Sequence, residues 1–107
     1  MAENALPTRR VALRIRADHP AFAGHFPGQP VLPGVSLLAE VLEALLDAPA
    51  LAALIGPVPR LAAAKFLAPV RPGAPLTIDL TAEPRAVRFE VRDAERVAAS
   101  GHFERAP

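Results

Sequence analysis

The sequence predicts a single α+β domain whose antiparallel sheet curls around one long helix. One strand pattern precedes the long helical pattern and several follow it, an order typical of α+β domains. The helix is apolar over most of its circumference, so it has to be wrapped by other elements rather than laid on one surface. At 107 residues the chain suits one domain, 1–107, and burial by a partner subunit would help it considerably. We therefore expect a dimer.

Apolar periodicity and turn residues divide the chain into segments. Val11, Leu13 and Ile15 alternate with Ala12, Arg14 and Arg16, which predicts a strand with one buried face. The expected order is a loose tail at 1–9, a strand at 11–16, a loop, a helix at about 35–47, a short helix at 51–55, and strands at 61–70, 76–81, 87–92 and 97–105. The strand at 61–70 is apolar on both alternations, so we expect it at the centre of the sheet.

The loop before the long helix is the most informative segment for function. Residues 19–38 read HPAFAGHFPGQPVLPGVSLL and contain four prolines and three glycines. Prolines restrict the backbone and glycines permit unusual conformations, so this composition holds His25 in a defined place. Pro33 and Gly34 open the helix, whose first-turn N–H groups can bind a carbonyl oxygen or an anion. A base and an oxyanion donor are therefore predicted to be neighbours.

The run H-F-P-G-Q-P-V-L-P-G-V, from His25 to Val35, resembles the signature of bacterial 3-hydroxyacyl-ACP dehydratases of the FabA/FabZ type. Residues 65–73 resemble the strand and turn written KF…PV.PG in this family, and 99–101 resemble its final strand. The short chain and the lead-in DHPAFAGHFPG are most similar to the small ApeI-like branch, associated with aryl polyenes and related specialised acyl chains. The resemblance implies a hotdog fold and a hydro-lyase that forms a trans-2-enoyl thioester in fatty-acid or specialised acyl-chain synthesis.

The resemblance also implies roles for particular residues and partners. Dehydration needs a base for the proton beside the carbonyl, a donor for the enolate oxygen and an acid for the leaving hydroxyl. His25 matches the family's base, and Gly34 matches the glycine whose amide binds the thioester oxygen. The expected substrate contacts are Phe26, Pro33, Val35 and Ala39. The expected partners are an acyl-ACP or acyl-CoA thioester, the acyl carrier protein, and a second subunit in a homodimer or hotdog heterodimer. No cofactor or metal is expected.

Ala39 departs from the family pattern, because the family's Glu or Asp stands fourteen residues after the histidine. Alanine cannot donate a proton. Glu40 is adjacent, but neighbouring helical residues point about 100° apart, so Glu40 does not take the missing acid's place. Glu40 belongs to a polar stripe expected to face solvent or a partner, made of Ser36, Glu40, Glu43 and Asp47. Ala39 is instead predicted to share a different, apolar face with Val35, Leu42 and Leu46, the face on which an acid of the site would need to project.

Three functions remain open at this point. The first is a dehydratase, active or impaired, in which a water, His25 itself or a carboxylate from another chain assists the departing hydroxyl. The second is a non-catalytic acyl-binding subunit paired with an active hotdog protein. The third is a hotdog thioesterase, for which only Glu40 and Glu43 offer a carboxylate.

The other histidines and phenylalanines have simpler interpretations. His19 precedes a proline in a loop and His102 lies on the polar alternation of the last strand, so both are expected to be structural. Phe22, Phe26 and Phe66 are more often core residues than tunnel lining, although in this fold the tunnel is cut through the core between subunits.

Charge and composition exclude several classes of function. Net charge is +1, and Lys65 is the single lysine among 12 basic residues, so no basic cluster suggests nucleic acid. Arginines at alternating positions, such as Arg14 and Arg16 or Arg88 and Arg92, are typical of a solvated sheet face. The alternative is that some of them bind the phosphopantetheine phosphate or the acidic surface of a carrier protein. Cysteine is absent, and no run approaches the ~20 apolar residues of a membrane span. With no apolar signal core in MAENALPTRR, we expect a cytoplasmic protein.

Overall fold

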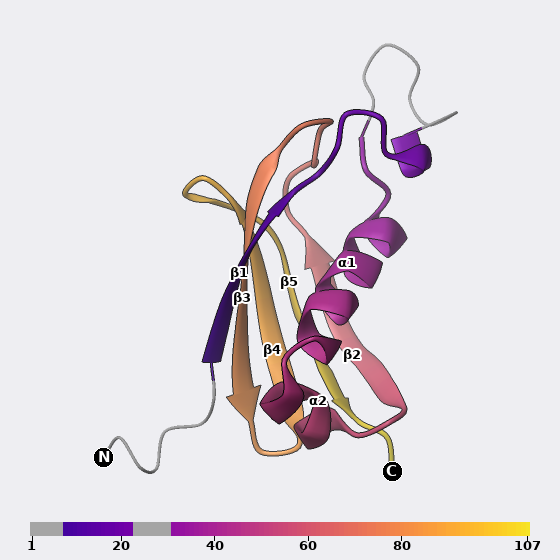
Figure 1. The fold of residues 1–107 in the computed structure, drawn as a ribbon, viewed down its shortest axis with the longest axis vertical. Coiled ribbons are helices and arrows are strands. Elements are labelled where there is room, and N and C mark those ends of the chain that lie inside the picture. Colours follow the sequence, from indigo (N-terminus) through magenta and orange to yellow (C-terminus); the bar gives the residue numbers. More distant parts are fainter. Residues whose placement is uncertain (1–7, 23–30) are drawn as a thin grey trace.

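A five-stranded antiparallel sheet bends around helix α1 in the computed structural model, which describes residues 8–22 and 31–107 (Figure 1). The strand order is β1-β3-β4-β5-β2, so β1 and β2 are the two edges. The elements are β1 (Thr8–Arg14), the 3₁₀-helix η2 (Pro20–Phe22), α1 (Gly34–Leu46), α2 (Pro49–Ile55), β2 (Pro59–Phe66), β3 (Pro75–Glu83), β4 (Ala86–Asp93) and β5 (Arg96–Arg105). The predicted α+β class is confirmed.

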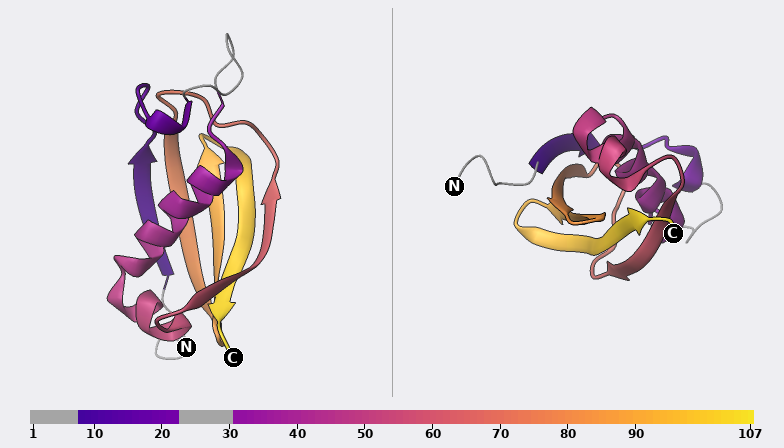
Figure 2. Two further views of the ribbon diagram at one scale, coloured as in Figure 1. Left: turned by 90° about the vertical axis from the view of Figure 1, so that its right-hand side faces the viewer. Right: turned by 90° about the horizontal axis from the view of Figure 1, so that it is seen from below.

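The core lies between the concave face of the sheet and one side of α1 (Figure 2). On the helix the buried positions are Leu37, Val41 and Leu45, spaced four residues apart as one helical face requires. On β3 and β4 every second residue is buried, which is the period of a strand with one covered face: Leu76, Ile78, Leu80, Ala82, Val87, Phe89 and Val91. The helix and the strands therefore bury the faces that their periodicity predicted.

Two predictions about the strands are wrong. The first strand begins at Thr8, so residues 8 and 9 pair with β3 instead of belonging to a tail; residues 1–7 lie outside the described part. The strand expected at 61–70 is β2, which ends at Phe66 and is an edge strand with mostly exposed side chains. Apolar residues on both alternations predict a strand that has a neighbour on each side, but among the described strands β2 pairs with β5 alone.

The remaining boundaries agree with the sequence to within a few residues. Helix α1 begins one residue before the expected start, and α2 begins at Pro49, which suits the first turn of a helix because proline lacks the N–H that would be unpaired there. In the described ranges, no helix is long and apolar enough to cross a membrane.

Candidate active site

The N-terminus of α1 is the centre of the candidate site. Pro33 precedes the helix in an extended conformation, and its carbonyl accepts hydrogen bonds from the amides of Ser36 (3.0 Å) and Leu37 (3.1 Å). The Leu32 amide donates to the carbonyl of Val70 (2.8 Å), which ties the chain before the helix to the segment after β2. The Gly34 amide, in the first turn, has no acceptor within the helix. The predicted opening of the helix at Pro33–Gly34 is confirmed.

A pocket of about 650 Å³ lies against this end of the helix. It is lined by residues 31–34, Leu37 and residues 66–70, which are almost all apolar. Pro33 and Gly34 therefore line the same pocket, and the substrate contact expected of Pro33 and the catalytic role expected of Gly34 stay predictions. The positive end of the helix dipole lies beside this apolar space, where it can attract a carbonyl oxygen.

Phe66 packs directly over Gly34. A Cβ atom placed on Gly34 would lie 2.7 Å from Cζ of Phe66, closer than such atoms approach one another, so this contact requires glycine. The expectation that Phe66 is a core residue is wrong: the residue is 52% exposed and lines the pocket. The match of Lys65 and Phe66 to the family's strand motif was the available signal for this role.

Val35 and Ala39 lie away from the pocket. Both are exposed, as is Leu46 on the same side of α1, whereas Leu42 is partly buried and packs against the core. The predicted grouping is therefore confirmed for Val35, Ala39 and Leu46, and Leu42 lies between this exposed face and the core. Neither Val35 nor Ala39 lines the pocket of its own chain, so their expected contact with a substrate stays a prediction that requires a second chain.

Glu40 lies on the flank of α1 that faces β1, on the side opposite the pocket. It lines a small cleft with Val11 and Leu13, and its Oε1 lies 3.6 Å from Nε2 of His19. The prediction that Glu40 faces solvent or a partner is wrong, because its side chain is only 26% exposed and lies against His19. The position of Glu40, on the side of α1 away from the pocket, agrees with the prediction that Glu40 does not replace the missing acid.

The remaining predicted residues divide into two groups. His25 and Phe26 lie outside the described residues, so their expected roles stay predictions. His102 lies on β5, pairs with Ala63 of β2, and has its Nε2 3.9 Å from Oε2 of Glu104, which fits the structural role expected for it. Among the residues described, no group of three or more potential metal ligands is found.

A sequence model of ApeI-like proteins, described as ApeI dehydratase, matches residues 3–102. The chain belongs to the ApeI-like family. Among curated proteins, a 3-hydroxyacyl-[acyl-carrier-protein] dehydratase FabZ of Symbiobacterium thermophilum is 38% identical over 84 residues, covering 69% of this chain and 56% of that protein. The chain thus spans about half the length of the curated relatives it matches.

Solved structures confirm the hotdog fold of this ApeI-like protein. An uncharacterized protein from Erwinia carotovora subsp. atroseptica superposes with a TM-score of 0.75 at 30% identity, over 94% of this chain and 83% of that chain. The dehydratase heterocomplex ApeI:P from Xenorhabdus doucetiae also superposes with a TM-score of 0.75, at 23% identity, over 95% of this chain and 89% of that chain.

Proposed function

We propose that this ApeI-like protein acts as a 3-hydroxyacyl-thioester dehydratase. One observation carries the proposal: the Gly34 amide, at the start of α1, lies on an apolar pocket in a chain of a dehydratase family. In this proposal His25 removes the proton beside the carbonyl, and the Gly34 amide stabilises the developing enolate oxygen. Loss of the hydroxyl as water then leaves a trans-2-enoyl thioester.

The pocket supports an acyl thioester as the substrate. Its volume of about 650 Å³ falls within the usual range for small-molecule sites, and its lining is apolar apart from backbone groups. An acyl chain can occupy such a space, while the thioester carbonyl lies at the helix N-terminus. We infer that the acyl group arrives on an acyl carrier protein or on coenzyme A.

We infer further that the complete site lies between two hotdog subunits. Ala39 does not line the pocket of its own chain, so in this proposal a second chain brings this position to the site. Whether that second chain is a copy or a homologue decides the chemistry. A copy places alanine where an acid is needed, whereas a homologue can supply a carboxylate.

The second candidate function is therefore a non-catalytic acyl-binding subunit that pairs with an active hotdog dehydratase. Ala39 is the observation that favours it, because a chain without its own acid is of use where its partner provides one. The hotdog thioesterase has less support, since Glu40 faces His19 and Glu43 lies on an exposed part of α1, both away from the pocket.

Turnover of a defined 3-hydroxyacyl-ACP by the wild type and by Ala39→Asp and Ala39→Glu tests the proposal. The wild type should be slow, because loss of general-acid assistance costs a factor of ~10²–10⁴ in rate. Either substitution should raise the rate, since burial between subunits raises the pKa of the new carboxyl toward the range where it donates near neutral pH. His25→Ala should abolish whatever activity exists.

Two results would change these conclusions. Fast wild-type dehydration that Ala39→Asp leaves unchanged and Glu40→Gln abolishes would identify Glu40 as the acid. Inactivity of the wild type and both Ala39 variants, with activity only in complex with a second hotdog protein, would establish the subunit function instead.

A further inference from the structure

His19 organises the short segment between β1 and residue 23. Its amide donates to the carbonyl of Arg16 (3.1 Å), its carbonyl accepts from the amide of Phe22 (3.0 Å), and its ring Nδ1 accepts from the amide of Ala21 (3.1 Å). Because Nδ1 is an acceptor, the proton of the neutral imidazole lies on Nε2. The backbone of this segment therefore sets which way the N–H of the ring points.

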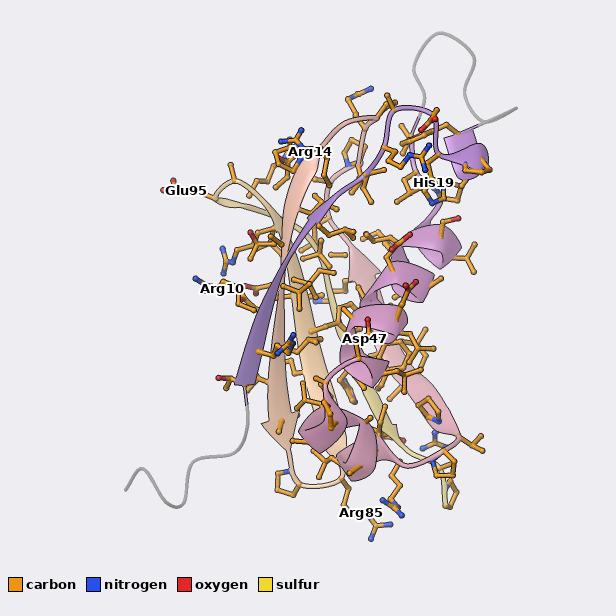
Figure 3. The ribbon with its side chains drawn as sticks, viewed as in Figure 1. Arg10, Arg14, His19, Asp47, Arg85 and Glu95 are labelled. Atoms are coloured by element: carbon orange, nitrogen blue, oxygen red, sulfur yellow. The ribbon has the colours of Figure 1, made fainter. Side chains whose placement is uncertain are left out.

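Nε2 of His19 points toward helix α1. It lies 3.6 Å from Oε1 of Glu40, and each of the two side chains is 26% exposed (Figure 3 labels His19). This distance is longer than a direct hydrogen bond, so the contact is an electrostatic attraction between the Glu40 carboxylate and the polar Nε2–H of the ring. Partial burial screens the attraction less than full exposure would.

Two other contacts hold the same segment. The ring of Phe22 meets the ring of His19 edge-on, with centroids 6.2 Å apart, and Phe22 is itself buried in the core. At the start of the segment, Arg16 donates two hydrogen bonds to Asp18 (2.9 and 2.8 Å). These hydrogen bonds, with the charge of Arg16, hold the pKa of the Asp18 carboxyl below its usual range. His19 is thus the residue that joins an ordered turn to α1.

We propose that His19 and Glu40 are a positioning pair that fixes residues 16–22 against helix α1. Glu40 and Gly34 belong to the same helix, and His25 follows Phe22 by three residues in the sequence. The pair therefore fixes the segment that ends three residues before His25 in the sequence against the helix whose first turn carries the Gly34 amide. Its effect on catalysis rests on the proposed dehydratase function; its effect on the segment does not.

Kinetics of five proteins separate positioning from proton donation: the wild type, Glu40→Ala, Glu40→Gln, His19→Asn and Glu43→Ala. Glu40→Ala should lower kcat roughly three- to tenfold and leave KM within about twofold of the wild type. This loss of kcat is smaller than the ~10²-fold that displacing a catalytic group by about one ångström can cost. Glu40→Gln leaves a carbonyl oxygen near Nε2–H but removes the charge, so it should recover only part of the rate that Glu40→Ala loses. Glu43→Ala, on the same helix but on an exposed position, should match the wild type.

His19→Asn divides the two functions of His19. An asparagine side chain can accept from an amide two residues later, so it preserves the turn, but it is too short to reach Glu40. His19→Asn should lower kcat as Glu40→Ala does. The double variant, which combines His19→Asn with Glu40→Ala, should lower kcat no more than either single variant. Loss of all activity in Glu40→Gln, or fully additive losses in the double variant, would overturn the positioning function.

Amide hydrogen exchange tests the pair without any activity. The amides of Ala21 and Phe22 should exchange roughly two- to fivefold faster in Glu40→Ala than in the wild type, and at the wild-type rate in Glu43→Ala. Faster exchange in a protein that dehydrates no substrate would sustain the pair and reject the dehydratase. Unchanged exchange at both amides in Glu40→Ala would reject the pair, whatever the protein catalyses.

Discussion

Gly34 and Gly101 are both required by close approach, but to neighbours of different kinds. At Gly34 the neighbour is the tip of the Phe66 ring, a half-exposed side chain that can rotate. At Gly101, on β5, a Cβ would lie 2.1 Å from the carbonyl oxygen of Ala63 and 2.8 Å from Cζ of the buried Phe89. The first contact can relax by moving one ring, whereas the second requires a strand to move.

Alanine at these two positions should therefore have unequal costs. Gly101→Ala should lower the free energy of unfolding by about 1–3 kcal/mol or more, as overpacking does, because it separates β5 from β2. Gly34→Ala should cost less than about 1 kcal/mol, since Phe66 can turn away. Urea unfolding of both variants measures the difference. Equal losses would show that Phe66 is held more firmly than its exposure indicates.

Which residues of α1 share a face was predictable, but what those residues touch was not. Apolar and polar spacing alone placed Ala39 with Val35 and set Glu40 on another side, because helical geometry fixes these directions. The contact between Glu40 and His19 was not predictable, since it depends on how the turn at 16–22 returns to the helix. The packing of Phe66 over Gly34 likewise joins segments far apart in the sequence.

Helix α2 illustrates how the ends of the elements are joined. The guanidinium Nη1 of Arg105 donates to the carbonyls of Ala53 (3.4 Å) and Leu54 (3.3 Å), in the last turn of α2. The Arg105 amide also donates to the carbonyl of Arg85 (3.0 Å) in the turn between β3 and β4. Arg105 thus supplies donors to helix carbonyls that have no partner within the helix, and ties α2 to the end of the sheet.

Arg105→Met tests this contact because it retains an apolar stem and removes the donors. The free energy of unfolding should fall by about 0.5 kcal/mol, the usual size for a cation at an exposed helix C-terminus. Arg85→Met is the matched control, since it removes a similar exposed side chain from the adjacent turn. Thermal unfolding at low ionic strength measures both. Equal melting temperatures for the two variants would show that the Arg105 contact contributes nothing.

Strand β2 shows why the position of one element in the sheet was predicted wrongly. Its apolar residues on both alternations are the pattern of a buried strand, and that pattern does not reveal which chain covers them. In this chain β2 is an edge, with Leu61 and Phe66 exposed. Most strand and helix boundaries depend on local signals and were predictable to within a few residues, whereas the order of strands depends on contacts between distant segments.

The exposed apolar residues gather on one side of the whole molecule. Six large hydrophobic residues are exposed in the described ranges, and five of them come from α1 or from β2 and the residue after it: Val35, Leu46, Leu61, Phe66 and Leu67. Figure 2, left, shows α1 and β2 on the same face. Exposed apolar residues that gather on one face of a small protein usually mark an interaction site. This gives the expected dimer a surface.

Val35→Glu should convert the dimer to a monomer, because two-fold symmetry places the new carboxylate in the interface twice. The matched control is Val58→Glu, because Val58 is 67% exposed and Val35 is 76% exposed. Val58 lies beside Ile55, Pro57 and Arg105, at the other end of the molecule. Light scattering at micromolar concentration should give twice the chain mass for the wild type and the control, and the chain mass for Val35→Glu. A monomeric wild type would contradict the homodimer. If the monomeric wild type then forms a stable complex with a second hotdog protein, and if Val35→Glu prevents that complex while Val58→Glu does not, the same face is the site of a heterodimer.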